Sequence, residues 1–146
     1  MGTPSVEVYS EVHLGEPMHN PEFTCSVGYD QHAACVVMVW KGYATTPLFR
    51  ETNERVLACL KDKQASRLLG DIRDFILISA ADQDWLNEVW IPRAIEIGLR
   101  RVALVQPSYY FNRVAVDNVT SRTDPNRLTV AYFDDADNAR TWLAGH

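Results

Sequence analysis

The sequence of 146 residues is poor in the motifs that usually mark catalytic and metal-binding proteins. Its three cysteines, Cys25, Cys35 and Cys59, are scattered through apolar surroundings without CxxC spacing, which predicts buried, reduced thiols. A glycine-rich phosphate loop is also missing, because Gly70 and Gly98 stand alone, so nucleotide binding through such a loop is not expected. These absences lead us to expect no cofactor.

The histidines form no recognisable metal pattern. His13, His19 and His32 match neither helical nor hairpin ligand spacing, and no cysteine or carboxylate completes a set. Two of these three histidines fall in a segment that is rich in proline, where no regular element would hold them in place. We therefore expect no metal site.

Clustered positive charge and long apolar runs are scarce as well. The net charge of −5 and the single basic pair, Arg100-Arg101, argue against a nucleic-acid partner, because phosphate binding needs clustered Lys and Arg. The longest uncharged apolar stretch, residues 32–40, is far too short to span a bilayer, and the N-terminus shows no secretion signal. We expect a cytoplasmic protein without a membrane span.

The composition that remains is that of a globular protein, with 47% hydrophobic and 23% charged residues. A chain of this length predicts one domain, which we place at residues 22–146. Residues 1–21 are interpreted as an edge strand or a loosely attached arm, because the alternation at residues 6–12 is followed by glycine and prolines.

The first half of the domain predicts a hairpin and then a strand–helix–strand unit. Strand-like runs at residues 22–27 and 32–40 are separated by residues 28–31, for which an antiparallel hairpin is the economical connection. A helix with Thr46 as its N-cap follows, and the apolar strand at residues 67–72 comes after it.

A second strand–helix–strand unit overlaps the first. Its helix, residues 79–98, has a capping-box-like start at Ser79 and an apolar face that includes Trp90, and Pro92 inside it predicts a kink or a break. The next apolar strand covers residues 101–106. Units of this kind favour parallel strands with right-handed crossovers, so the strands after the hairpin should run parallel.

In the last third of the chain, the sequence pattern is irregular at first and then indicates a strand and a helix clearly. Residues 107–122 give only a hint of a short helix, because polar residues interrupt the periodicity. Residues 127–133 predict a final strand, and Asp134-Asp135 cap a terminal helix.

Candidate binding residues gather where the parallel strands end. The turns after these strands share one edge of the sheet, which is where open α/β sheets usually bind ligands. We expect this edge to bind a protein partner or a small anionic ligand. The residues that we assign to it are Asp71, Arg73, Asp74, Ser79, Tyr109 and Tyr110.

Several of these residues have a structural alternative. Asp71 and Asp74 could serve as an acid/base pair, but carboxylates that flank Arg73 more often form a salt bridge. Ser79 could accept a phosphate, favoured by a helix N-terminus, although plain capping explains it more simply. The aromatic cluster at residues 109–111 suits a partner or homodimer contact if it is exposed, and a core flap if it is buried.

The order of elements, together with VVMVWKGYATTPLFR, LLGDIRDF and ADQDWLNEVWIPRAIEIGLRRVALV, resembles the STAS-like group of small bacterial proteins related to anti-sigma-factor antagonists, the SpoIIAA-like fold. The resemblance covers roughly residues 29–143. It implies a mixed sheet, with an N-terminal antiparallel hairpin and then parallel strands, and helices packed mainly on one face. It also implies a regulatory or binding module without a cofactor, in which Ser79 is the nearest candidate for the phosphorylated serine of such antagonists.

We therefore expect a non-enzymatic STAS-like module that docks a partner or ligand at the carboxyl edge of the sheet. The alternative is a SEC14-like carrier, which the topological similarity to the CRAL-TRIO fold suggests, holding a small apolar or amphipathic ligand under the Trp90 helix. A third hypothesis, a hydrolase that uses Asp71 or Asp74, requires a deep pocket at that edge. The edge strand and surface aromatics also make a homodimer reasonable.

Overall fold

The computed structural model describes residues 12–15, 18–20, 22–76, 79–108 and 110–145, and seven strands in these ranges form one mixed sheet. The sheet order is β1-β3-β4-β5-β6-β7, and β2 also pairs with β3. β3 and β4 are antiparallel, whereas β4 to β7 run parallel, as the sequence predicts. The strands are β1 (His13–Leu14), β2 (Met18–Asn20), β3 (Phe23–Asp30), β4 (Cys35–Gly42), β5 (Arg67–Phe75), β6 (Arg101–Val105) and β7 (Thr129–Phe133).

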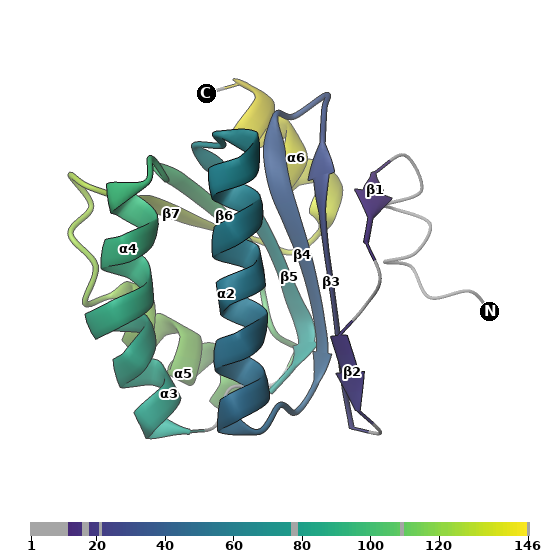
Figure 1. Cartoon of the computed structure of the whole chain (residues 1–146). Coiled ribbons are helices and arrows are strands. Elements are labelled where there is room, and N and C mark those ends of the chain that lie inside the picture. Colours follow the sequence, from purple (N-terminus) through teal and green to yellow (C-terminus); the bar gives the residue numbers. More distant parts are fainter. Residues whose placement is uncertain (1–11, 16–17, 21, 77–78, 109, 146) are drawn as a thin grey trace.

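Helices cover both faces of the sheet, but unequally (Figure 1). One face carries most of them, with α5 packed beside α3, and the other carries the C-terminal helix α6. This distribution confirms the α/β class and the expectation that helices pack mainly on one face. The helices are α2 (Thr46–Lys63), α3 (Ala80–Trp85), η1 (Leu86–Trp90), α4 (Ile91–Glu96), α5 (Tyr110–Thr120) and α6 (Ala136–Gly145).

Two apolar layers result from the pleat of the central strands. In β4, Met38 and Trp40 pack toward α2, whereas Val37 and Val39 pack toward α6. β5 is divided in the same way, and its side chains are buried on both faces. Continuous apolar runs in these strands are typical of a parallel sheet that is covered on both sides.

The hairpin between β3 and β4 turns later in the chain than the sequence predicts. We expected the turn at residues 28–31, but β3 continues to Asp30 and the turn occupies residues 31–34. The buried carboxylate of Asp30 accepts hydrogen bonds from the backbone N–H groups of His32 and Ala33, at 2.9 and 3.1 Å. Arg140 of α6 donates to its other oxygen at 2.7 Å. These partners fix the turn at a place that local propensity alone does not reveal.

The strand β5 is longer than the predicted segment 67–72. It pairs with β4 as far as Gly42 and Phe75, with a register shift opposite Val39–Lys41. Arg73 and Asp74, which we predicted in the turn after this strand, therefore lie within β5. The additional residues of β5 pair with the end of β4 beyond this register shift, a local irregularity of the kind that a β-bulge produces.

The helix α2 begins with Thr45, and not Thr46, in the N-cap position, and no side chain caps it. Thr46 instead donates a hydrogen bond to the Asp82 carboxylate at 3.3 Å. At the other end of α2, Gln64 adopts a left-handed conformation with φ of 51°, and its N–H bonds to the carbonyl oxygens of Leu60 and Lys61. The predicted helix is thus correct, but its starting residue is wrong by one position.

The predicted disturbance near Pro92 takes the form of a π-helical turn. The segment 79–98 divides into α3, the π turn η1 and then α4, with Pro92 in the first turn of α4. In this continuous helical segment Pro92 has no N–H to donate to the preceding turn, and the backbone departs from α-helical geometry immediately before it. Gly98, with φ of 116°, follows the end of α4, as the sequence predicts.

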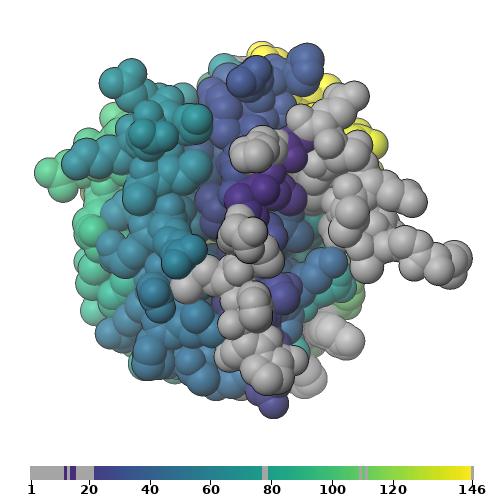
Figure 2. Space-filling model, turned by 45° about the vertical axis from the view of Figure 1, so that its right-hand side comes forward, coloured from purple at the N-terminus to yellow at the C-terminus, as the bar shows by residue number. Residues whose placement is uncertain are grey.

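Short strands protect the edge of the sheet at β3. Met18–Asn20 pairs with the first half of β3 and His13–Leu14 with the second half. Figure 2 shows these two segments, in dark purple, on the surface along this edge beside the blue helix α2. A covered edge is less available for pairing with other chains. The predicted alternating strand at residues 6–12 lies, apart from Val12, outside the described residues.

The Trp90 ring lies in the core, as predicted, and is 5% exposed. Its indole N–H donates to the backbone oxygen of Asn53 in α2 at 2.8 Å. We expect Trp90→Ala to lower the free energy of unfolding by about 3–5 kcal/mol, measured by urea denaturation, because a large buried ring is removed. Trp90→Phe, which loses less volume, should cost less. Equal urea midpoints for wild type and Trp90→Ala would contradict this placement.

Candidate functional site

The carboxyl ends of β4, β5, β6 and β7 meet at one edge of the sheet. We call this edge the rim and define it by residues 42–46, 71–76, 79–82, 106–117 and 132–135, without residue 109. Of the predicted site residues, Tyr109 lies outside the described residues. The others lie on the rim, but in three different environments.

Asp71 and Arg73 form a bidentate ion pair on β5. The Nε and Nη2 atoms of Arg73 lie 3.0 and 2.7 Å from the two oxygens of Asp71. Asp71 is 3% exposed, and its Oδ1 also accepts from the backbone N–H of Arg73 at 3.3 Å. Of the two alternatives, acid/base pair or salt bridge, this geometry supports the salt bridge. A paired guanidinium keeps the carboxylate charged and fixes both side chains.

Asp74 is exposed and does not share this pair. The register shift between β4 and β5 places it opposite Lys41. Asp74 and Lys41 thus contribute accessible charges of opposite sign next to the ion pair. The predicted Asp71/Asp74 acid/base pair is therefore divided into one buried and one exposed carboxylate.

Ser79 caps the first turn of α3. Its Oγ accepts a hydrogen bond from the backbone N–H of Asp82 at 3.2 Å, which confirms the predicted cap. The structure adds a feature that the capping pattern did not reveal: the Asp82 side chain is 3% exposed and turns toward α2. One of its oxygens accepts from Thr46, and the other has no hydrogen-bond partner. Asp82 therefore joins the N-terminal ends of α2 and α3, where helix dipoles favour a negative charge.

Of the aromatic cluster at residues 109–111, which follows β6, the structure describes only the side chain of Tyr110. Tyr110 is 72% exposed, and Val114, one turn later in α5, is 49% exposed. Of the two alternatives, contact surface or core flap, this exposure favours the contact surface. A hollow of about 260 Å³ lies beside it and is lined by Gln106, Pro107, Arg113, Val114, Val116, Asp117 and Tyr132.

Backbone contacts connect this hollow with β5. The N–H of Ser108 donates to the carbonyl oxygen of Arg73 at 3.1 Å, and the side chain of Asn112 donates to the carbonyl oxygen of Phe75. Arg113 donates to the carbonyl oxygen of Pro107 at 2.9 Å, which orders the loop before α5. The structure thus brings the Asp71–Arg73 pair to the same part of the rim as α5. Ser79 belongs to a separate part, held by the first turn of α3.

The cysteines offer no activated nucleophile. Burial raises the pKa of the Cys35 thiol to about 12, with a smaller contribution from the negative charge of Asp30. Burial also raises the pKa of the Cys25 and Cys59 thiols. A protonated thiol is a poor nucleophile, so the interpretation as structural cysteines agrees with their environment.

Within the described ranges, no group of three or more His, Cys, Asp and Glu side chains is close enough to hold a metal ion. Within the same ranges, no helix has the length and apolarity needed to cross a membrane.

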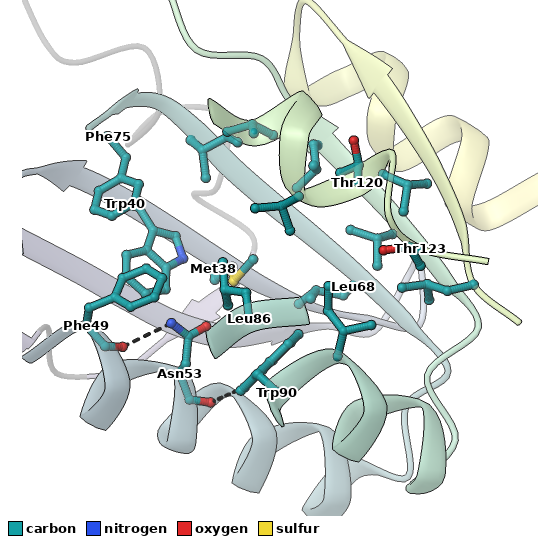
Figure 3. A pocket seen from close by; sticks show the side chains of 18 residues that line it. Met38, Trp40, Phe49, Asn53, Leu68, Phe75, Leu86, Trp90, Thr120 and Thr123 are labelled. Carbon is teal, nitrogen blue, oxygen red and sulfur yellow. Dashed lines mark hydrogen bonds between the residues drawn. The ribbon is translucent and has the colours of Figure 1, made fainter. Parts of the chain in front are cut away.

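An apolar cavity of about 120 Å³ lies between the sheet and the helices, and Val116 lines both this cavity and the rim hollow. Figure 3 shows it between the sheet and the surrounding helices, with Trp40, Met38, Leu68, Leu86 and Trp90 around it. The cavity lies where the carrier alternative places its ligand, next to the helical segment that contains Trp90. Only packing of distant segments determines how much volume stays empty.

Comparison with known proteins supports the fold. The structure is similar to the crystal structure of an anti-sigma factor antagonist from Mycobacterium paratuberculosis, with a TM-score of 0.51 and 13% sequence identity. The match covers 86% of this chain and 98% of that chain. No protein-family model matches the sequence, and no curated protein matches it. The chain thus has the fold of anti-sigma-factor antagonists, which confirms, for the fold, the STAS-like resemblance.

The Ser79 cap can be tested by stability. We expect Ser79→Ala to lower the free energy of unfolding by about 1 kcal/mol, because the N–H of Asp82 loses its acceptor. Ser121→Ala is a suitable control, since the Ser121 hydroxyl is exposed and should change stability by less than about 0.5 kcal/mol. Equal urea midpoints for the two variants would show that the cap contributes nothing.

Thiol labelling tests the burial of the cysteines. At pH 8, Cys25 and Cys35 of the folded protein should not react with a chromogenic disulfide reagent, because their raised pKa values leave almost no thiolate. Cys59 is only half-buried and should react slowly, and in urea all three should react at once. Removal of the slow phase by Cys59→Ser would assign it. Rapid labelling of Cys35 in the folded protein would contradict the structure.

Proposed function

We propose that this protein is a non-enzymatic regulatory module that binds a protein partner through the rim. The single observation that carries the proposal is the combination of an anti-sigma-factor-antagonist fold with an exposed aromatic and aliphatic surface on α5, at the carboxyl end of the sheet. The structurally similar protein from Mycobacterium paratuberculosis is described as an anti-sigma factor antagonist. We propose an anti-sigma factor as the partner of this chain also.

The chemistry of the rim suits a protein surface. Tyr110 and Val114 present apolar area, and exposed tyrosine combines a large contact area with a hydroxyl that can find a partner. Arg113 and Asp117 at the adjacent hollow, together with the exposed Asp74, supply charges of both signs that could select among partners. The rigid Asp71–Arg73 pair supports this region from beneath the loop before α5.

Phosphorylation of Ser79 is part of the proposal as a means of release. A phosphate on Oγ would come close to the buried Asp82 carboxylate and would compete with the cap. Like charges repel strongly where solvent is excluded, so the modification would loosen the first turn of α3. Ser79 would then act through the position of α3 and not through direct chemistry.

The hydrolase alternative receives less support from the geometry. The hollow at the rim is lined neither by Asp71 nor by Asp74. The carrier alternative is favoured by a different observation, the apolar cavity beside Trp90. We further propose that the protein acts in the cytoplasm. A homodimer is proposed through the short edge strand β7, which pairs with β6 on one side and has no second strand among the described residues.

Binding can be measured with a purified anti-sigma factor from the same organism and variants of the full chain. We expect Tyr110→Ala and Val114→Asp each to weaken binding at least tenfold in calorimetry without changing the melting temperature, because both side chains are exposed. Val89→Ala is the matched control, since Val89 is also exposed but lies on η1, outside the rim. Wild-type affinity in both rim variants, or equal loss in the control, would overturn the docking surface.

A further inference from the structure

The interior cavity contains an unsatisfied polar group, and we propose that it is a binding site for a small neutral molecule of about one aromatic ring that carries one hydrogen-bond acceptor. The Trp40 indole N–H is the group that recognises this acceptor. The site lies between the sheet and the helices and uses none of the exposed rim side chains. It therefore stands or falls independently of partner docking.

The size and lining of the cavity determine the class of ligand. Its volume of about 120 Å³ is lined mostly by aliphatic and aromatic side chains. An engineered cavity of about 150 Å³ lined by Leu, Ile and Phe stays dry and binds benzene, so the present volume suits a single ring and is too small for a lipid chain. A charged ligand is unsuitable because the lining residues include no ionisable side chain that could pair with it.

The polarity of the site comes from Trp40. This residue is 3% exposed, and its Nε1 has no hydrogen-bond partner. Trp90, in the same cavity wall, differs because its indole N–H is bonded to Asn53. In Figure 3 the nitrogen edge of Trp40 is turned toward the cavity and Met38. A buried donor without an acceptor is unfavourable, so a ligand that supplies an acceptor gains more here than an equally shaped hydrocarbon.

The wall next to Trp40 can adapt to such a ligand. Met38 lines the cavity, and its unbranched thioether chain changes rotamer easily. Met38 and Leu104 both lie over Gly70 of β5, where an added Cβ would be 2.8 Å from Met38 Cε and 2.9 Å from Leu104 Cδ2. The missing side chain at Gly70 thus gives these two residues the room that they occupy. A shift of Met38 would let an acceptor reach the indole N–H.

Two other features belong to the same cavity. Leu86 and Trp90, the two ends of the π turn η1, form part of its wall, and π turns within helices frequently occur at functional sites. The hydroxyl of Thr123 is a second buried polar atom without a hydrogen-bond partner in the cavity lining. In Figure 3 it lies across the cavity from Trp40.

The test compares benzonitrile with phenylacetylene, which has nearly the same shape but lacks the nitrile acceptor. Each probe is titrated into the full-length ¹⁵N-labelled protein while the indole N–H resonances are recorded. We expect benzonitrile to bind about fivefold more tightly than phenylacetylene and to move the Trp40 resonance downfield. The nitrile stretching band of the bound probe should shift to higher frequency, as it does on accepting a hydrogen bond.

Variants separate the hydrogen bond from the cavity. Trp40→Phe keeps an aromatic wall but removes the donor, so it should bind both probes with equal affinity. Trp142→Phe is the matched control, because Trp142 packs against Phe133 on the opposite face of the sheet, and it should keep the fivefold preference. Val119→Phe, which fills the cavity, should abolish binding of both probes. If that variant does not fold, the comparison of Trp40→Phe with Trp142→Phe decides.

Three results would overturn the proposal. They are a Trp40 resonance that does not move at saturating benzonitrile, equal affinity of the wild type for the two probes, and a preference that persists in Trp40→Phe. None of these results bears on the rim. Conversely, loss of partner binding in the Tyr110 and Val114 variants leaves this site intact, so failure of one proposal is distinguishable from failure of the other.

Discussion

Burial of β5 on both faces is the constraint on which the rest of the structure depends. β5 pairs in parallel with β4 and β6, while Leu68 packs into the layer beneath α2 and Leu69 packs into the layer beneath α6. A parallel sheet of this kind is stable only if helices cover both of its faces. This arrangement also determines the position of the rim, because the parallel strands β4 to β7 all end at the same edge of the sheet.

Buried carboxylates then determine how separate elements are joined. Asp30 links the β3–β4 turn to α6 through Arg140, and Asp82 links the starts of α2 and α3 through Thr46. Asp71 is held by its neighbour Arg73. A charge that is removed from solvent requires partners, so each of these carboxylates stabilises one particular arrangement of the segments around it. These contacts orient the helices whose ends form the rim.

The rim and the cavity are different kinds of site on one scaffold. The rim is open and carries both apolar and charged side chains, which suits a protein surface. The cavity between the sheet and the helices is smaller and almost wholly apolar, with isolated polar atoms in its lining, which suits a small molecule. Val116 of α5 lines both the cavity and the rim hollow, so this helix is a physical boundary between them. In the two proposals, the same helices provide an outer surface for the protein partner and an inner surface for the small molecule.

The sequence by itself determined the order of strands and helices, the parallel direction of the later strands, the Ser79 cap and the core position of Trp90. Each of these follows from a local pattern of apolar residues, capping residues and connection lengths. Tertiary structure alone decided that β5 extends to Phe75, that Thr46 bonds to Asp82, that Tyr110 is exposed and that a cavity remains beside Trp40. These features depend on contacts between segments far apart in the chain, and local periodicity contains no information about pairing length, side-chain partners or unfilled volume.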